Sequence, residues 1–275
     1  MKERRGNFTP SLFIGLLIFS IISVIALLSI FWLPYSLENT DGGRLSPPSG
    51  AHWLGTDKLG RDLLARLMVG ARIALSVGFS SVAIAAIVGL TLGLAAGFAQ
   101  RWLDDSLSAL LDILIAFPTL LLAMLIVAAR GSSLTSVILA IGFGISAIIA
   151  RLTRILVKRV LAKDFILASR TSGTSWPRAI AIHVLPNIWP TLIVSFALQF
   201  GLAGLAEASL SYLGLGAPPP NASWGSLLQE AQGTILISPI AAIAPGVLLV
   251  ALVIGLNLIA DGFRDLLDPT TRGIR

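Results

Sequence analysis

Two carboxylates stand within long apolar stretches of the sequence, where ionisable side chains are uncommon. Asp112 and Glu207 each lie in a run of mostly aliphatic residues that is long enough to cross a membrane. An ionised carboxylate at the bilayer centre costs about 3 kcal/mol or more unless it faces protein or water. We therefore expect both side chains to point inward, to be paired or to stay protonated. Two roles are open: a substrate-amine contact or pore-lining site, and a hydrogen bond to a nearby serine, such as Ser108, Ser209 or Ser211, that packs helices together.

The sequence offers no arrangement typical of an active site or a bound metal. It contains no cysteine, and its two histidines, His52 and His183, are far apart in the chain. These counts exclude thiolate chemistry and disfavour a histidine metal site. There is also no Ser/His/Asp arrangement and no Gly-x-x-x-x-Gly-Lys-Ser/Thr phosphate loop. We expect no catalysis, no metal and no cofactor on this chain.

The composition is that of an integral membrane protein. Of 275 residues, 55% are hydrophobic and 12% are charged, against roughly 25% charged residues in an ordinary soluble domain. A net charge of +6 would suggest nucleic acid as a partner of a soluble protein. Lysines and arginines retained in cytoplasmic loops explain the excess better. We therefore expect no nucleic acid among the partners.

The apolar runs predict an all-α, polytopic membrane protein with six transmembrane helices, because barrel strands would alternate polar and apolar residues. The expected spans are 11–33, 73–98, 107–129, 134–152, 188–213 and 237–260. The first run is too long for a secretory signal and lacks a cleavage pattern, so we interpret it as a retained anchor. Most of the 20 Lys and Arg residues fall on the side of the N-terminus, which predicts that both termini are cytoplasmic.

This pattern divides the chain into a cytoplasmic tail with the first anchor at 1–34, a periplasmic loop at 35–72, and a membrane core at 73–275. Within the loop, a helix is predicted from Asp57 to Arg72. Asp57 can cap this helix, leucines gather on one side of it, and Asp62 faces Arg66 one turn later. We expect it to lie along the outer membrane surface. The proline-rich segment that ends at Trp224 also belongs at the outer interface.

Small residues recur on two of the expected spans. Gly89, Gly93 and Gly97 follow one another at four-residue spacing in the second span, and further glycines and alanines line the fifth. Such spacing lets helix backbones approach closely in lipid. Packing within one bundle is favoured, and a contact between subunits is the alternative.

The densest basic segment lies between the fourth and fifth spans, at residues 154–187. Its helical pattern continues out of the membrane until Gly173 breaks it, since glycine readily takes the left-handed conformation at a helix end. Ser175 can cap a second helix, Pro177 suits its first turn, and Pro186 ends it. The pattern predicts two short helices joined at a glycine corner, which a protein partner could grip as a rigid lever.

This loop resembles the signature of the membrane permease subunits of binding-protein-dependent ABC importers, in their dipeptide, oligopeptide and nickel branch. The family signature is Glu-Ala-Ala, three residues, Gly, nine residues and Ile-x-Leu-Pro. Gly173 sets the register here, and Leu167 and His183 stand where the family has Glu and Ile. Further runs are similar to the branch at 54–62, at Asp112 with 116–118, and at 207–216 with 223–225. The matches cover most of the chain between residues 54 and 268.

The resemblance implies one permease subunit of an ATP-driven importer for peptides, with a permease core at 73–275. It implies as partners a homologous permease, two ATP-binding subunits that hold ATP and magnesium, an extracytoplasmic substrate-binding protein, and membrane lipid. The expected location is the inner membrane of a bacterial or archaeal cell. Contact with the ATPase is expected at Ala168, Ser169, Arg170, Thr171, Ser172, Gly173, His183, Leu185 and Pro186. Contact with the binding protein is expected at Asp57, Arg61, Asp62 and Trp224.

Because Asp112 and Glu207 lie in motifs shared by permeases of different substrates, we favour a structural or gating role for them over direct substrate binding. The identity of the substrate stays open, since permeases of the same family also transport nickel chelates or other small solutes. A stand-alone secondary transporter is disfavoured, because the two halves of the chain show no convincing internal repeat.

Overall fold

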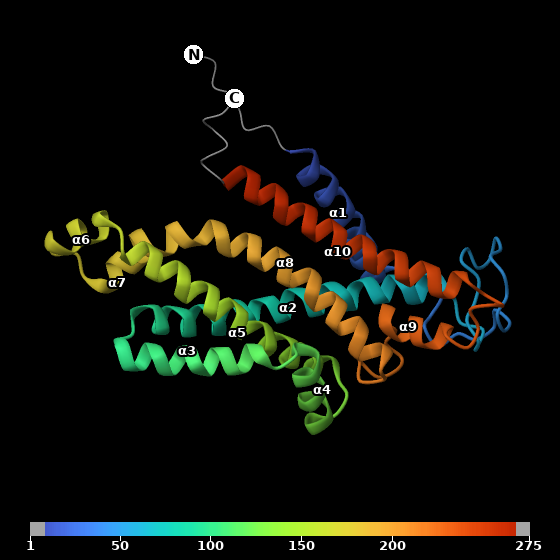
Figure 1. Cartoon of the computed structure of the whole chain (residues 1–275). Coiled ribbons are helices and arrows are strands. Elements are labelled where there is room, and N and C mark those ends of the chain that lie inside the picture. The colour runs from blue at the N-terminus through green and yellow to red at the C-terminus, as the bar shows by residue number, and fades with distance from the viewer. Residues whose placement is uncertain (1–8, 268–275) are drawn as a thin grey trace, which may run out of the picture.

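The computed structural model describes residues 9–267, and in this range every named secondary-structure element is a helix. Helices long and apolar enough to cross a membrane are α1 (Pro10–Phe31), α2 (Leu63–Phe98), α5 (Leu134–Leu161), α8 (Leu185–Tyr212) with the turns before it, and α10 (Ile240–Leu267). A bent pair, α3 (Arg101–Ala116) and α4 (Thr119–Arg130), occupies the place of the third expected span. The all-α polytopic fold is therefore confirmed, and Figure 1 shows the helices as one elongated bundle.

The third expected span is not one straight helix. α3 and α4 meet at an angle of 85°, with Phe117 and Pro118 between them. Proline disfavours the helical conformation of the residue before it, and Phe117 accordingly has φ −74° and ψ 128°. α3 runs beside α2 and α5, whereas α4 turns away from it (Figure 1). The expectation of a single span at 107–129 is thus wrong in its boundaries and in its shape.

α2 is longer than the second expected span. It has 36 residues, or about 54 Å at 1.5 Å per residue, and so extends well beyond a hydrocarbon core of about 30 Å. It begins at Leu63, where the Asp62 side chain accepts a hydrogen bond from the amide of Ala65 at 2.8 Å. The separate surface helix expected at 57–72 is therefore wrong, and Asp57 is not its cap. No proline interrupts α2 after Leu63, so its first turns and the expected span form one helix.

The glycines of α2 pack against α5. A Cβ atom on Gly93 would lie 2.5 Å from Cβ of Thr153, which is closer than real side chains approach. Added Cβ atoms on Gly89 and Gly97 would collide in the same way with Ile149 and Val157. The three glycines therefore let the two backbones touch, as small residues do in membranes. This confirms the interpretation of the stripe as packing within one chain.

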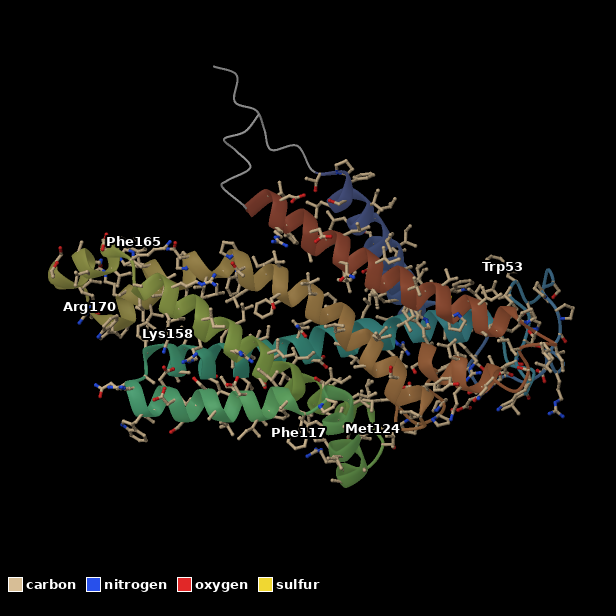
Figure 2. All side chains as sticks on the ribbon, in the orientation of Figure 1. Trp53, Phe117, Met124, Lys158, Phe165 and Arg170 are labelled. Carbon is tan, nitrogen blue, oxygen red and sulfur yellow. The ribbon has the colours of Figure 1, made fainter. Side chains whose placement is uncertain are left out.

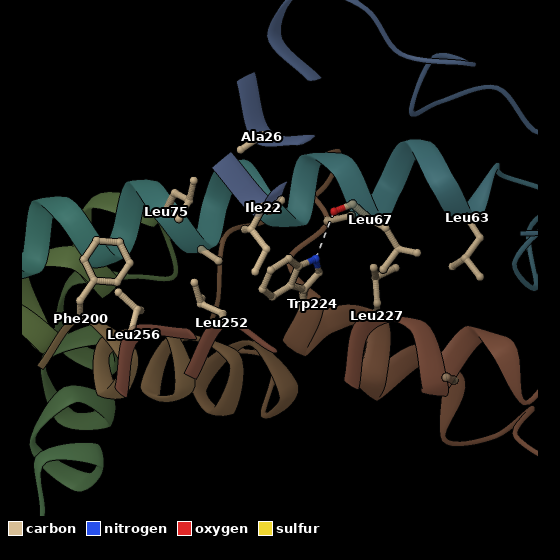
Figure 3. Close-up of a cluster of buried hydrophobic side chains, with 14 of the residues drawn as sticks. Ile22, Ala26, Leu63, Leu67, Leu75, Phe200, Trp224, Leu227, Leu252 and Leu256 are labelled. Atoms are coloured by element: carbon tan, nitrogen blue, oxygen red, sulfur yellow. Dashed lines mark hydrogen bonds between the residues drawn. The ribbon is translucent and has the colours of Figure 1, made fainter. Parts of the chain in front are cut away.

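A second layer joins α1 and α10 to α8 and the N-terminal half of α2. α1 and α10 lie antiparallel at close range, since a Cβ on Gly15 would meet the carbonyl oxygen of Gly255 at 2.7 Å. Figure 3 shows the shared core, in which Ile22, Leu75, Phe200 and Leu252 come from the four helices. α9 (Trp224–Ala231) closes the outer end of this core.

Several basic residues that we assigned to the cytoplasm from sequence lie outside the described residues, among them Lys2, Arg4, Arg5, Arg272 and Arg275. Within the described range, the start of α1 and the end of α10 lie together, and the 34–62 loop lies at the opposite end of these two helices (Figure 1).

Candidate functional site

The glycine corner is a compact turn that projects from one end of the bundle. α6 (Asp164–Thr171) ends in it, and α7 (Trp176–Ala179) leaves it (Figure 1). Gly173 has φ +88°, its amide donates to the carbonyl oxygen of Arg170 at 3.0 Å, and the amide of Thr174 donates to that of Ser169 at 3.2 Å. This pair of bonds is the Schellman motif that ends helices with a left-handed glycine. The predicted glycine corner is confirmed.

Side chains brace the corner from within. Ser169 Oγ donates to Thr174 Oγ1 at 3.0 Å and lies 3.1 Å from Nε2 of His183. The guanidinium carbon of Arg170 lies 4.3 Å from the ring centroid of Trp176, and Trp176 packs edge-on against Phe98 at the end of α2. Figure 2 labels Arg170 and Phe165 at this end of the molecule. The corner is therefore attached to α2 as well as to its own two helices.

The surface of the corner is available to a partner. Of the residues expected to contact an ATPase, Ala168, Thr171, Ser172, Gly173 and Pro186 are exposed, while Ser169, Arg170, His183 and Leu185 are half-buried. The five exposed residues are accessible to a partner. Ser169, Arg170 and His183 make the contacts that hold the corner in shape.

The sequence suggested that the helix after the corner ends before Pro186. In the structure the helix continues through this proline. A π-helical turn, η1 (Ile180–Val184), follows α7 and continues directly into α8. The amide of Leu185 donates to the carbonyl oxygen of Ile180, and Pro186 follows as the second residue of α8. The corner is thus joined without a break to a membrane-spanning helix.

A second connection links α5 to α3 through an acidic residue that the sequence did not single out. Asp104 accepts from Arg154 Nε at 2.6 Å and from its terminal nitrogen at 2.9 Å, and it also pairs with Lys158. Such a bidentate arginine pair is geometrically specific. No local pattern could reveal it, because Asp104 and Arg154 are 50 positions apart on different helices. Two of the basic residues of α5, Arg154 and Lys158, therefore hold this helix against α3.

The two intramembrane carboxylates have different surroundings. The side chain of Asp112 is 58% exposed in this chain and pairs with Arg151 at 3.2 Å, and Ser108 bonds a backbone carbonyl instead. The expected Ser108 partner is therefore wrong. Glu207 is only 2% exposed and accepts a hydrogen bond from Ser211 Oγ at 2.6 Å. Ser211 lies one turn further along α8, so this hydrogen bond is made within one helix.

A network of four charged residues lies at the N-terminal end of α2, which the sequence predicts to face outward. Arg66 bonds Asp57 at 2.6 Å and holds Glu230 of α9 with two nitrogens, each at 2.7 Å. Arg61 bonds the same carboxylates at 2.7 and 3.0 Å. Burial alone would raise the pKa of Asp57 and of Glu230. Hydrogen bonds from Arg61 to Asp57 and from Arg66 to Glu230 outweigh burial, so both pKa values lie below their ordinary values.

This arrangement changes the roles expected for the outer residues. Asp57, Asp62 and Trp224 are all buried, so they shape the outer end and present no surface to a binding protein. Asp62 also does not face Arg66, because it pairs with His52 at 2.9 Å. Arg61 lines a polar cavity of about 300 Å³ together with Glu230, Gln229, Asn221 and the Pro218–Pro220 segment. Of the four expected contacts, Arg61 alone borders this outer surface.

Comparison with known proteins agrees with these features. The family model described as "Binding-protein-dependent transport system inner membrane component" matches residues 89–273. The chain is 41% identical over 257 residues to the dipeptide transport system permease protein of Alkalihalophilus pseudofirmus, covering 93% of this chain and 84% of that protein. It is 39% identical over 274 residues to the glutathione transport system permease protein of Escherichia coli, covering 99% and 89%.

Among solved structures, the inward-facing MetNI methionine ABC transporter contains a chain of similar fold. The TM-score is 0.62 at 21% sequence identity, and the match covers 74% of this chain and 97% of the other. The family model begins in the last turns of α2 and covers the helices after it, including the glycine corner and residues 207–216. The chain belongs to the family of inner membrane components of binding-protein-dependent transport systems.

Proposed function

We propose that this chain is one of two permease subunits in an ATP-driven importer of peptides. The relatives named above are permeases for a dipeptide and for glutathione, and both of these substrates are short peptides. The chain would form half of the translocation pathway in the inner membrane of a bacterium or archaeon, with both termini in the cytoplasm. ATP and magnesium would be held by two partner subunits, and an extracytoplasmic binding protein would deliver the substrate.

The observation that carries this proposal is the exposed corner at Gly173 with its rigid connections. The corner is continuous with α8 through η1, and Trp176 joins it to the end of α2. A displacement of the corner would therefore act on two membrane-spanning helices at once. Coupling between two sites requires such a shared element, whose two arrangements are favoured by different ligands. Binding of ATP to the partner subunits would favour one of the two arrangements of this element over the other.

At the other end, the polar cavity beside Arg61 and Glu230 offers the surface on which we place the delivery protein. The network of Asp57, Arg61, Arg66 and Glu230 holds the rim of this cavity in a fixed shape. The docking surface would consist of the exposed residues around the network, with the buried members supporting them.

Cross-linking in the assembled transporter tests the proposal. Since the sequence contains no cysteine, Ser172→Cys introduces a single thiol on the exposed corner. A maleimide–succinimide reagent should join it to a lysine of the co-expressed ATP-binding subunit. Ser36→Cys, exposed in the opposite loop, is the matched control and should not react with that subunit. ATP-dependent peptide uptake by proteoliposomes completes the test. A corner that cross-links to no ATP-binding subunit in an active transporter would refute the coupling role.

A further inference from the structure

A groove between α4, α5 and α8 has no role in the coupling corner or the outer network. Its volume is about 270 Å³, slightly below the smallest typical ligand pockets, which have about 300 Å³. Leucine, isoleucine and alanine side chains form most of its walls, among them Leu120, Ile145 and Leu202. The polar residues that line it are Thr119, Gln199 and Ser209.

Gln199 is the unusual member of this lining. It lies near the middle of α8, is only 9% exposed, and makes no side-chain hydrogen bond with any residue in the described range. Ser209, in contrast, donates to the carbonyl oxygen of Leu205 at 2.8 Å. The amide of Gln199 lines the groove and is left free by the residues that the structure describes, so it can bond to a group that enters the groove. An amide has both donor and acceptor atoms, so its complement is a group that offers both.

We propose that this groove binds the transported peptide, with the Gln199 amide pairing with a peptide group and the aliphatic walls holding an apolar side chain. This inference rests on the proposed function. An extended peptide has free N–H and C=O groups, whereas a lipid acyl chain has none. A partner helix also cannot pair with Gln199 through its backbone, because membrane helices use these groups internally. The low polarity of the walls strengthens a hydrogen bond formed there.

The test compares an amide with its ester in the assembled transporter, reconstituted with a saturating amount of loaded binding protein. The probes are alanyl-leucine and the depsipeptide in which an ester oxygen replaces the peptide N–H. Gln199→Met keeps the side-chain length and removes the amide. We expect it to slow alanyl-leucine uptake about ten-fold and depsipeptide uptake by less, so that the amide-to-ester ratio falls. Gln232→Met, at an exposed glutamine, is the control and should leave both rates unchanged.

Unchanged uptake ratios in Gln199→Met would overturn this inference and leave peptide import intact. If the wild type transports neither probe, nor any other short peptide, the proposed function itself fails. Ala206→Leu provides a second test should Gln199→Met not assemble, because it narrows the groove without touching the amide. It should slow leucyl-leucine several-fold more than glycylglycine. Equal effects on the two dipeptides would argue that another group, such as a partner side chain, fills the groove.

Discussion

Trp224 donates its indole N–H to the carbonyl oxygen of Leu67 at 3.1 Å, across 157 positions of sequence. The ring is 1% exposed and packs against Gly70, where an added Cβ would be 2.4 Å from Cδ1. This contact fastens α9 to the outer turns of α2. Since α9 also carries Glu230, one buried aromatic ring and one ion network together close the outer end of the bundle.

Replacing Trp224 should reveal how much of this closure depends on the ring. We expect Trp224→Ala to lower the free energy of unfolding by about 4 kcal/mol, because it leaves a large cavity. Trp224→Phe should lose about 1 kcal/mol, mainly the hydrogen bond. Thermal unfolding in detergent measures both. Trp53→Ala, at a tryptophan that is exposed in the outer loop, is the control, and a shift as large as that of Trp224→Ala would contradict the prediction.

The helix contact between α2 and α5 predicts a strong position dependence for glycine replacement. Gly93→Val should destabilise the protein by about 2 kcal/mol or more, since the new side chain would overlap Thr153. Gly246→Val is the matched control, because Gly246 is also helical but has no atom within 4 Å of an added Cβ. Unfolding in detergent should separate the two variants clearly. Equal losses would indicate a general intolerance of valine in these helices.

The outer network predicts an acid-sensitive contribution to stability. The pKa values of Asp57 and Glu230 are lower in the folded protein than their ordinary values of 3.8 and 4.5. Their contribution is therefore fully present above about pH 5 and declines as the pH falls through the lowered values. Melting temperatures measured between pH 7 and pH 3 should fall at the acid end. Glu230→Gln should reduce this pH dependence, because one of the two shifted groups no longer titrates.

Glu230→Gln should also cost stability at neutral pH. Arg66, whose side chain is 4% exposed, would keep only Asp57 as a charged partner among the residues that the structure describes. Removing one member of a fully buried pair typically costs about 3 kcal/mol, and the loss should be smaller here because Glu230 is partly exposed and Arg66 keeps Asp57. Glu38→Gln, at a carboxylate outside the network, serves as the reference. A Glu230→Gln variant as stable as this reference would show that the network is replaceable.

The glycine corner allows a test with two glycines that both have a positive φ. Gly173 and Gly131 have φ +88° and +87°, and neither has an atom near an added Cβ. Gly173→Ala should cost about 1 kcal/mol of stability, and Gly131→Ala should cost at least as much, because ψ 154° puts Gly131 in a conformation open almost only to glycine. ATP-driven transport should fall several-fold in Gly173→Ala alone, and Gly173→Pro should abolish it while the protein remains in the membrane. Full uptake in Gly173→Pro would refute the coupling role.

Glu207 distinguishes a packing role from substrate contact. Glu207→Gln keeps an acceptor for Ser211 and should leave the substrate preference of the transporter unchanged, whereas Glu207→Leu should reduce assembly by removing the partner of Ser211. Competition of a labelled peptide by cationic and neutral peptides measures preference. A selective loss of cationic peptides in Glu207→Gln would instead assign this carboxylate to the substrate.

Local features of the molecule were readable from sequence because neighbouring residues encode them. Apolar runs of membrane length predicted the spans, since a helix must be long enough to cross the bilayer. Gly173 predicted the corner, because a left-handed helix end suits glycine. The four-residue glycine spacing on α2 predicted close packing, because small residues on one face let two helix backbones approach.

Two errors in the helix boundaries arose where the sequence allowed more than one local solution. Asp57 and Asp62 can each cap a helix, and sequence alone does not choose between them. The structure selects Asp62, because the Asp57 carboxylate is engaged by Arg61 and Arg66. Pro186 does not end a helix, because the π turn before it places the proline in the first turn of α8.

Only the tertiary structure decided which distant residues meet. Asp104 pairs with Arg154, and Arg66 with Glu230, across 50 and 164 positions of sequence. Hydropathy places each helix in the membrane, but it does not say how the helices are rotated or which neighbours they have. The burial of Trp224 depends on that rotation, as does that of Gln199. The sequence therefore determined the segments and the corner, and packing determined the contacts, because a contact needs the positions of both partners.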